Sequence, residues 1–471
     1  LNLMLHFNLY YLRFFTSLIS IFCFLNILYS YYFNLYLNVD SYFYTLLISL
    51  IPLLSFFFKK KDSLKITIYS KILAVVVGYF ILPLFISLPF YFSIYNISFL
   101  SAYFEAISGF TSTGFTIFEN IKHLDESLIL WRSSSQWIGG LFFLIFLILF
   151  FSNKTFNYKM TNLTFSGDSN FKSEENIKNN ILKIFIYYVV ISLLIFCILN
   201  FSGIRLFNSL NLTMTLASSG GFLPSNSLNE IVLTNLQEII LIASMLISIF
   251  NFYLIFNLVD KKIIINEHKE DLYLAILAIT LILFLYFNNL DLLDVIINVL
   301  SSLATSGLTL TKSDNNLSLY FLLITIIGGS LISNTSGIKL TRFFILLKIT
   351  SAEIIKLISP NSVINKSIFN SENKITDENV KISFLIFISF FLSLFILSSF
   401  LVFDNIGFER SFKLSILALT NTVNSEMYNL QNINFANLLI SSKMSLIIFM
   451  IIGKIELISF FLIFKKIFFK D

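Results

Sequence analysis

Short runs of small hydroxyl residues that end on a glycine recur between long apolar segments of this chain. The first is Phe110 to Ile117, which reads F-T-S-T-G-F-T-I. Irregular backbone at membrane depth is viable only where protein buries it or where it lines a path for water. Glycine adopts the positive φ that turns a carbonyl aside, and a set of such carbonyls can replace the water around a bare cation. These runs are therefore candidate cation-coordinating loops.

Three loops place small polar residues before a glycine and a large apolar residue after it, which we expect to anchor the loop. Their residues are Ser112, Thr113, Gly114 and Phe115; Ser219, Gly220, Gly221 and Phe222; and Thr305, Ser306, Gly307 and Leu308. One such run of small polar residues and glycine is weak evidence for a functional loop, because ordinary turns contain it. Three of them, each after a short amphipathic stretch and before a spanning segment, are difficult to explain as coincidence.

The fourth stretch in the same position, Leu419 to Tyr428, contains no glycine. Among the residue types, glycine adopts positive φ most readily and asparagine comes next. We therefore align Thr422, Val423 and Asn424 with the polar-polar-glycine pattern of the other loops. A register one residue earlier is possible, but it puts the β-branched Val423 at the glycine position in a strained conformation.

The elements that must hold these loops are helices in a membrane. The chain has 471 residues, of which 56% are hydrophobic and 13% charged, and its mean hydropathy is +0.84. A soluble domain carries roughly 25% charged residues. Apolar runs of about 20 residues recur from end to end, which predicts an all-α polytopic membrane protein. The net charge of +5 does not indicate nucleic-acid binding, because the lysines cluster at the ends of apolar segments.

The predicted unit is helix, half-helix, loop, helix, and it occurs four times after a prelude of two helices. We assign the prelude to residues 1–65 and the repeats to 66–152, 153–260, 261–350 and 351–471. The half-entering stretches are 97–118, 206–225, 291–311 and 408–430. Lysine clusters between the helices all fall on one side, which predicts that this side and both termini are cytoplasmic. Four such repeats can bury their polar loops together around a common axis, which predicts a central pore within one chain.

Two neighbouring stretches read F-E-A-I-S-G-F-T-S-T-G-F-T at 104–116 and L-I-L-W-R-S-S-S-Q-W-I-G-G at Leu128 to Gly140. Together they resemble the first repeat of the Trk/Ktr/HKT superfamily of potassium transporters. The two-helix prelude is similar to the TrkH branch rather than to the shorter KtrB branch. The stretch Ile326 to Lys339 resembles the family's glycine-rich gating loop, and Met450 to Glu456 resembles the basic motif of its last helix.

The resemblance implies a gated, potassium-selective pore in a bacterial inner membrane, with the four loops as the filter that binds the transported K⁺. It implies no organic cofactor and no enzyme activity. It also implies a membrane homodimer with a cytoplasmic nucleotide-binding regulatory partner of the TrkA/RCK type. The implied gate residues are Lys454, Gly328, Gly329, Ser333, Asn334 and Gly337. The chain departs from the family in its glycine-free fourth loop, its glycine-poor gating loop and a lysine at 454 where arginine is usual.

Lys454 and Glu456 lie within the last apolar stretch, where charges usually face a water path or a partner. Residues two apart on a helix do not face each other, so we do not expect these two to pair. We expect Lys454 to project beneath the filter and repel cations. The alternative is a lysine that snorkels or pairs elsewhere. Glu105 and Gln136 are candidates either to brace the first loop from behind or to be ordinary polar core residues.

Other classes of function fit the sequence less well. An alternating-access transporter with one midplane site would have paired inverted repeats with broken helices, whereas these four repeats share one orientation. A membrane enzyme would need converging acid, base, nucleophile or metal-binding residues, and the three histidines show no ligand spacing. Sodium or mixed permeation, or ion coupling, is the alternative within the same fold. In plant members serine at the first-loop glycine accompanies sodium transport, so Gly114 favours potassium while Asn424 weakens that argument.

Overall fold

The described part of the chain is helical almost throughout. The computed structural model describes residues 2–54, 68–151, 174–252, 254, 268–287, 291–311, 315–370, 374–430 and 433–455. Several predictions concern residues outside this set. They are the cytoplasmic position of the lysines at 59–65, 154–172, 261–262 and 465–470, and the place of Glu456 in the last apolar stretch. These stay predictions. Four described helices contain stretches long and apolar enough to cross a membrane, at Leu12–Tyr32, Leu73–Tyr91, Ile181–Phe201 and Asp377–Val402.

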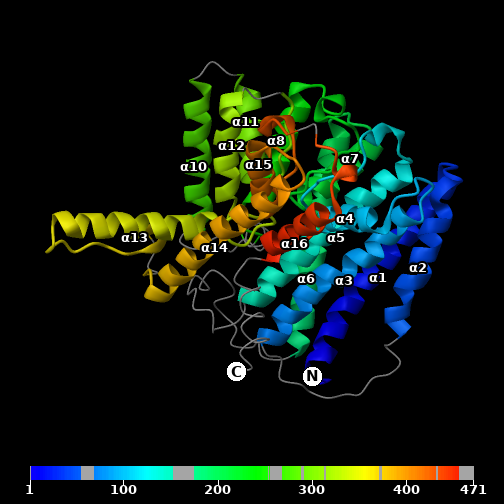
Figure 1. The fold of residues 1–471 in the computed structure, drawn as a ribbon, viewed down its shortest axis with the longest axis horizontal. Helices are drawn as coiled ribbons and strands as arrows, with labels where there is room; N and C mark the ends of the chain where they lie inside the picture. Colours follow the sequence, from blue (N-terminus) through cyan, green and yellow to red (C-terminus); the bar gives the residue numbers. More distant parts are fainter. Residues whose placement is uncertain are drawn as a thin grey trace.

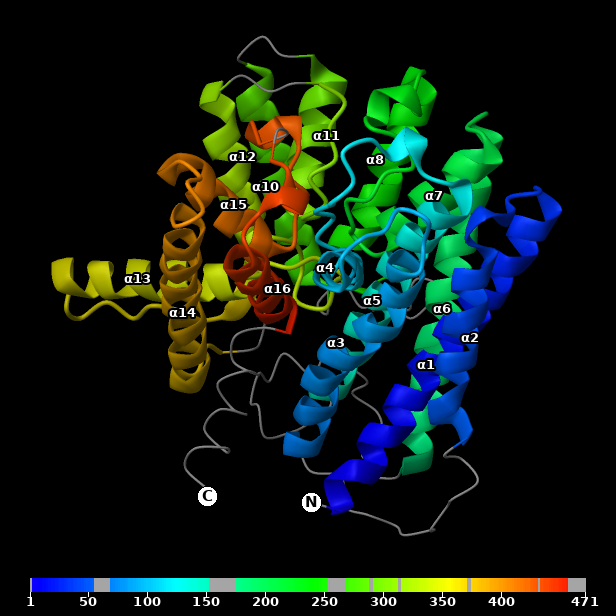
Figure 2. The same cartoon turned by 45° about the vertical axis from the view of Figure 1, so that its right-hand side comes forward.

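The order of elements follows the predicted pattern of two helices and then four units. The two-helix prelude consists of α1 (Asn2–Tyr32) and α2 (Val39–Leu54). The outer helices of the units are α3 (Ile68–Tyr91) and α5 (Glu126–Phe151), α6 (Glu174–Phe201) and α8 (Asn235–Ile249), α10 (Lys269–Tyr286) and α12 (Asn315–Ile327), and α14 (Asp377–Val402) and α16 (Ile440–Ile455). In Figure 2 the prelude lies on one side of the molecule, and α10, α12 and α14 lie on the other.

Between each pair of outer helices lies a half-helix, as the sequence predicts. The half-helices are α4 (Phe99–Phe110), α7 (Leu206–Ala217), α11 (Leu292–Leu303) and α15 (Phe408–Thr420), with 12, 12, 12 and 13 residues. A helix of that length spans about 18 Å, whereas the hydrocarbon core of a bilayer is about 30 Å thick. Each half-helix therefore ends inside the molecule, and its carboxyl end delivers the following loop there.

Helix α13 (Leu340–Ile358) departs from the prediction. The sequence predicts one unusually long segment from 317 to 349 that polar residues interrupt. In the structure α12 ends at Ile327, and α13 runs across the direction of the other helices and away from them (Figure 1). The break occurs because the intervening loop turns sharply. Gly328, Gly337 and Lys339 all have positive φ, of 68°, 88° and 75°. Hydropathy alone cannot detect this turn, since apolar residues continue on both sides of it.

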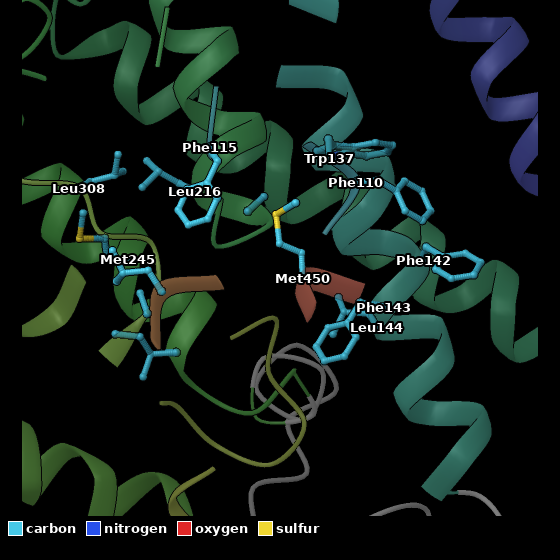
Figure 3. Packing of buried hydrophobic residues seen from close by; sticks show 14 of the residues in the cluster. Phe110, Phe115, Trp137, Phe142, Phe143, Leu144, Leu216, Met245, Leu308 and Met450 are labelled. Atoms are coloured by element: carbon cyan, nitrogen blue, oxygen red, sulfur yellow. The ribbon is translucent and has the colours of Figure 1, made fainter. Parts of the chain in front are cut away.

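Small residues let the helices approach the half-helices closely. A methyl group on Gly139 of α5 would lie 1.9 Å from the carbonyl oxygen of Phe110, and one on Gly453 of α16 would lie 2.3 Å from that of Leu419. Both carbonyls belong to the last turn of a half-helix. Aromatic rings fill the space beside this contact: the centroids of Phe110 and Phe142 are 5.2 Å apart (Figure 3). These glycines therefore help to fix the ends of α4 and α15 in the core.

Candidate functional site

The loops that follow the four half-helices meet one another. A methyl group on Gly114 would lie 2.9 Å from the Cα of Gly221 and 3.1 Å from the Cβ of Val423. One on Gly221 would lie 3.0 Å from the carbonyl oxygen of Ser306, and one on Gly307 would lie 2.8 Å from that of Val423. Segments from all four units are therefore in direct contact at one point in the molecule.

The four loops also share one backbone conformation. Each has one non-glycine residue with positive φ within two residues of the end of its half-helix: Ser112 at 61°, Ser219 at 53°, Thr305 at 53° and Asn421 at 50°. The N–H of the next residue donates to a carbonyl five residues earlier, in the pairs Thr113 to Ser108 at 2.9 Å, Gly220 to Thr215 at 2.8 Å, Ser306 to Ser301 at 3.1 Å and Thr422 to Leu417 at 2.9 Å. Equivalent residues can therefore be assigned without ambiguity.

This equivalence corrects the predicted register of the fourth loop. Asn421 matches Ser112, so Val423 occupies the glycine position and Asn424 matches Phe115. The prediction that Asn424 takes the glycine position is wrong. It assumed that this position requires positive φ, but the described residues with positive φ include Gly114 and Gly307 and neither Gly221 nor Val423. A β-branched residue is consequently tolerated there, and the strained position is two residues earlier.

A cavity of about 590 Å³ opens on one side of the meeting point, and we call it the vestibule. Gly114, Gly221, Gly307 and Val423 all line it. Of the other loop residues proposed from the sequence as the filter, Phe222, Leu308 and Asn424 also line it. The remaining ones lie buried beside it: Ser112, Thr113, Phe115, Ser219, Gly220, Thr305, Ser306 and Thr422. The vestibule wall carries both charges, with Glu119, Glu426 and Arg132.

The apolar residue after each glycine is buried, as expected of an anchor. Phe115 is 0% exposed, Phe222 1% and Leu308 2%. The ring of Phe115 stacks on that of Phe435, with centroids 4.9 Å apart, and the guanidinium carbon of Arg132 lies 4.1 Å from the ring centre of Phe222. Contacts of these anchoring side chains thus hold the first two loops in place.

A buried ion pair supports the first loop from behind. Arg132 Nε lies 2.8 Å from Glu105 Oε1, and both side chains are at most 1% exposed. Glu105 also accepts hydrogen bonds from the N–H of Ile117 at 2.9 Å and from the hydroxyl of Thr116 at 3.0 Å. Gln136, a candidate either to brace the same loop or to be an ordinary polar core residue, accepts the N–H of Phe222 at 3.3 Å, so it supports the second loop. The sequence could not show which neighbouring repeat this face of α5 contacts.

The segment 328–339, which we call the intramembrane loop, contacts the second and third loops. The carbonyl of Asn334 accepts the hydroxyl of Ser219 at 2.9 Å, and the hydroxyl of Thr305 accepts the N–H of Ser336 at 3.1 Å. Lys454 of α16 donates to that same carbonyl of Asn334 at 2.9 Å. Lys454 is 1% exposed, and its ammonium lies 4.6 Å from the ring centre of Phe143. The described vestibule lining contains no residue of the intramembrane loop.

Comparison with known proteins identifies the family. The family model TrkH, described as "Cation transport protein", matches residues 39–288, more than half of the chain. This chain belongs to the TrkH family of cation transport proteins. It is therefore an integral membrane protein of ion transport rather than an enzyme, and the predicted resemblance to the TrkH branch is confirmed.

Several relatives of this TrkH-family chain agree with that assignment. An uncharacterized cation transporter of Methanocaldococcus jannaschii is 27% identical over 404 residues, which cover 82% of this chain and 80% of the relative. The Trk system potassium uptake protein TrkG of Escherichia coli is 24% identical over 402 residues, covering 80% of each chain. The crystal structure of the potassium transporter TrkH from Vibrio parahaemolyticus matches with a TM-score of 0.79, covering 97% of this chain and 98% of that one at 19% identity. The predicted fold class is confirmed.

Two residues that the sequence analysis left without a role hold the intramembrane loop of this TrkH-family chain. The ammonium of Lys339 donates to the carbonyls of Ser330 at 3.2 Å and Ser333 at 3.3 Å, to the hydroxyls of Ser333 at 3.1 Å and Thr335 at 3.0 Å, and to the carbonyl of Thr335. The carboxylate of Glu270 accepts the N–H of Leu331 at 2.8 Å and the hydroxyl of Thr341. Both are ionisable residues at the edge of apolar segments, which is the signal that could have found them.

Proposed function

We propose that this chain is the pore-forming subunit of a potassium uptake system and conducts K⁺ between its four converged loops. The observation that carries the proposal is the mutual contact of Gly114, Gly221, Gly307 and Val423 beneath the vestibule. Main-chain oxygens near this point can replace the hydration shell of a monovalent cation. The filter comprises the residues predicted from the sequence, with Val423 in the fourth glycine position.

Potassium is the proposed ion for two reasons. The relatives TrkG and TrkH of Escherichia coli are named potassium uptake proteins. In addition, the four described residues at the meeting point are three glycines and a valine, and none of these four carries a carboxylate that would favour a divalent cation. Sodium or mixed permeation is the second candidate, because Val423 replaces a glycine in one quarter of the site.

The proposed gate is the contact between Lys454 and the intramembrane loop. An ammonium at this depth repels a cation leaving the filter, because charges interact strongly where water is excluded. Gly328, Gly329 and Gly337 allow the loop to pack closely: a methyl on Gly328 would lie 2.3 Å from the carbonyl oxygen of Ser336. Ser333 and Asn334 supply oxygens that the two lysines hold. Opening the pore then requires the loop to leave Lys454.

The proposed assembly is a homodimer in a bacterial inner membrane, with both termini in the cytoplasm. A cytoplasmic nucleotide-binding protein of the TrkA/RCK type is the proposed regulatory partner. The names of the Escherichia coli relatives, which belong to a Trk system, support this assignment. The four repeats with the predicted boundaries are part of the same proposal.

Cation uptake by the purified chain in liposomes tests the function. We expect K⁺ uptake that exceeds Na⁺ uptake, and we expect Gly221→Ala to abolish it, because the added methyl would lie 2.4 Å from the Cβ of Val423. Gly407→Ala is the matched control, since a methyl there has nothing within 4 Å. The variants are compared at equal folded yield. Absence of cation uptake by both the intact chain and its Lys454→Ala variant, or wild-type uptake by Gly221→Ala, would contradict the proposal.

A further inference from the structure

Four equivalent residues form the floor of the vestibule, and Val423 is the one among them that has a branched aliphatic side chain. The other three positions are Gly114, Gly221 and Gly307, and all four line the cavity. Val423 is half-buried, whereas the three glycines are buried. Its side chain is therefore part of the surface that an ion meets where the vestibule reaches the filter.

The isopropyl group of Val423 fills space next to the other glycines. A methyl on Gly221 would lie 2.4 Å from the Cβ of Val423 and 2.9 Å from its Cγ1. A methyl on Gly307 would lie 3.0 Å from the same Cγ1, and one on Gly114 would lie 3.1 Å from the Cβ. Non-bonded carbon atoms prefer about 3.5–4.0 Å. The side chain of Val423 therefore occupies the space beside the Cα atoms of all three glycines.

This side chain has little freedom to move aside. A β-branched residue has restricted χ1 rotation. The backbone before Val423 is fixed as well, because Thr422 donates its N–H to the carbonyl of Leu417 at 2.9 Å. Asn421 donates to the hydroxyl of Thr113 at 3.0 Å and to the carbonyl of Met450 at 2.8 Å. The apolar group is consequently a rigid part of the wall.

We propose that Val423 is a size-limiting specificity residue, which excludes the largest alkali cation, Cs⁺, more strongly than K⁺ or Na⁺. A rigid apolar group offers no oxygen to the ion and narrows the site on one side only. A larger cation would have to displace the isopropyl group or move away from the opposite oxygens. The inference rests on the proposed function, since it assumes that cations pass between the four loops.

Ratios of cation flux through the full chain in liposomes test this inference. We expect Val423→Gly to raise the ratio of Cs⁺ to K⁺ flux by roughly tenfold, because changes of a few carbon atoms in a close-fitting site alter discrimination by about that factor or more. Val423→Ala should give an intermediate rise. Val423→Ile keeps a β-branched apolar side chain and adds no oxygen, so it should not raise the ratio. Val363→Gly, at a fully exposed residue, is the matched control for the same substitution.

The outcomes separate this inference from the function on which it rests. Cation flux with an unchanged Cs⁺ to K⁺ ratio in Val423→Gly overturns the size-limiting role and leaves the pore intact. An equal rise of the Cs⁺ to K⁺ flux ratio in Val363→Gly also overturns the size-limiting role. If Val423→Gly does not fold, the ratio of Val423→Ala decides by the same criterion. No flux of any cation through either the folded wild-type chain or the folded Lys454→Ala variant overturns both the pore and the inference.

Discussion

The side-chain amide of Asn421 donates a hydrogen bond to the hydroxyl of Thr113, 3.0 Å away in space and 308 residues earlier in the chain. The same amide group donates to the carbonyl of Met450 at 2.8 Å. One residue thus ties the fourth loop to the first loop and to α16. It does so from a backbone conformation with φ of 50°, which asparagine tolerates better than most residues.

Asn421 allows its backbone and side-chain roles to be separated. Asn421→Gly keeps the positive φ and loses both hydrogen bonds, whereas Asn421→Ala loses both bonds and also strains the backbone. We expect thermal stability to fall in the order wild type, Asn421→Gly, Asn421→Ala, with a net cost of about 0.5–1.5 kcal/mol per lost bond. Melting curves of the purified proteins measure this. Asn424→Ala, one residue beyond Val423, should cost less, and an equal cost would argue against the assigned register.

Removing the ammonium of Lys454 should raise basal flux of K⁺ or Rb⁺. Lys454→Ala eliminates the charge and its hydrogen bond to Asn334, whereas Lys454→Arg retains a charge and should keep basal flux low. Flux into liposomes in the absence of any partner protein is the measurement. Lys381→Ala, at an exposed lysine of α14, is the control. Unchanged flux in Lys454→Ala at equal expression would count against the gate.

Much of this arrangement is predictable from local sequence, and what was missed depended on contacts between repeats. The half-helices are predictable because each short amphipathic stretch is followed by small polar residues, which end on a glycine in three of the four cases. The register of the fourth loop was missed, although T-N-T at 420–422 matches T-S-T at 111–113. The mistake was to place the requirement for positive φ at the glycine rather than at the central residue of this tripeptide.

The course of α13 and the partner of Gln136 illustrate the other kind of miss. Residues on both sides of the intramembrane loop are apolar, so composition cannot reveal that the chain turns between α12 and α13. Gln136 could be assigned to the pore region from its place in the motif. Whether it supports the first or the second loop is decided by how α5 packs against α7, which one repeat alone does not encode.

Glu270 should be needed to hold the intramembrane loop. Glu270→Ala leaves the N–H of Leu331 and the hydroxyl of Thr341 without this acceptor. An unsatisfied buried donor costs about 1–3 kcal/mol, so we expect a lower melting temperature and, because the loop loosens, higher basal K⁺ flux. Glu353→Ala removes an exposed carboxylate on α13 and serves as the control. A loss of stability without any change in flux would show that Glu270 supports the fold but not the gate.

The buried pair of Glu105 and Arg132 should contribute far more to stability than an exposed pair in the same protein. Arg132→Met leaves the Glu105 carboxylate buried without its charged partner, and breaking a buried pair in this way typically costs about 3–5 kcal/mol. Lys122→Met breaks the pair with Glu230, whose side chains are 56% and 35% exposed, and surface pairs contribute about 0–1 kcal/mol. Melting curves of both variants should therefore differ strongly. Because Glu105 also binds Thr116 and Ile117 after the first glycine, K⁺ flux through any folded Arg132→Met protein should fall as well. Equal melting temperatures for the two variants would mean that water reaches Glu105, and then the pair could not brace the first loop.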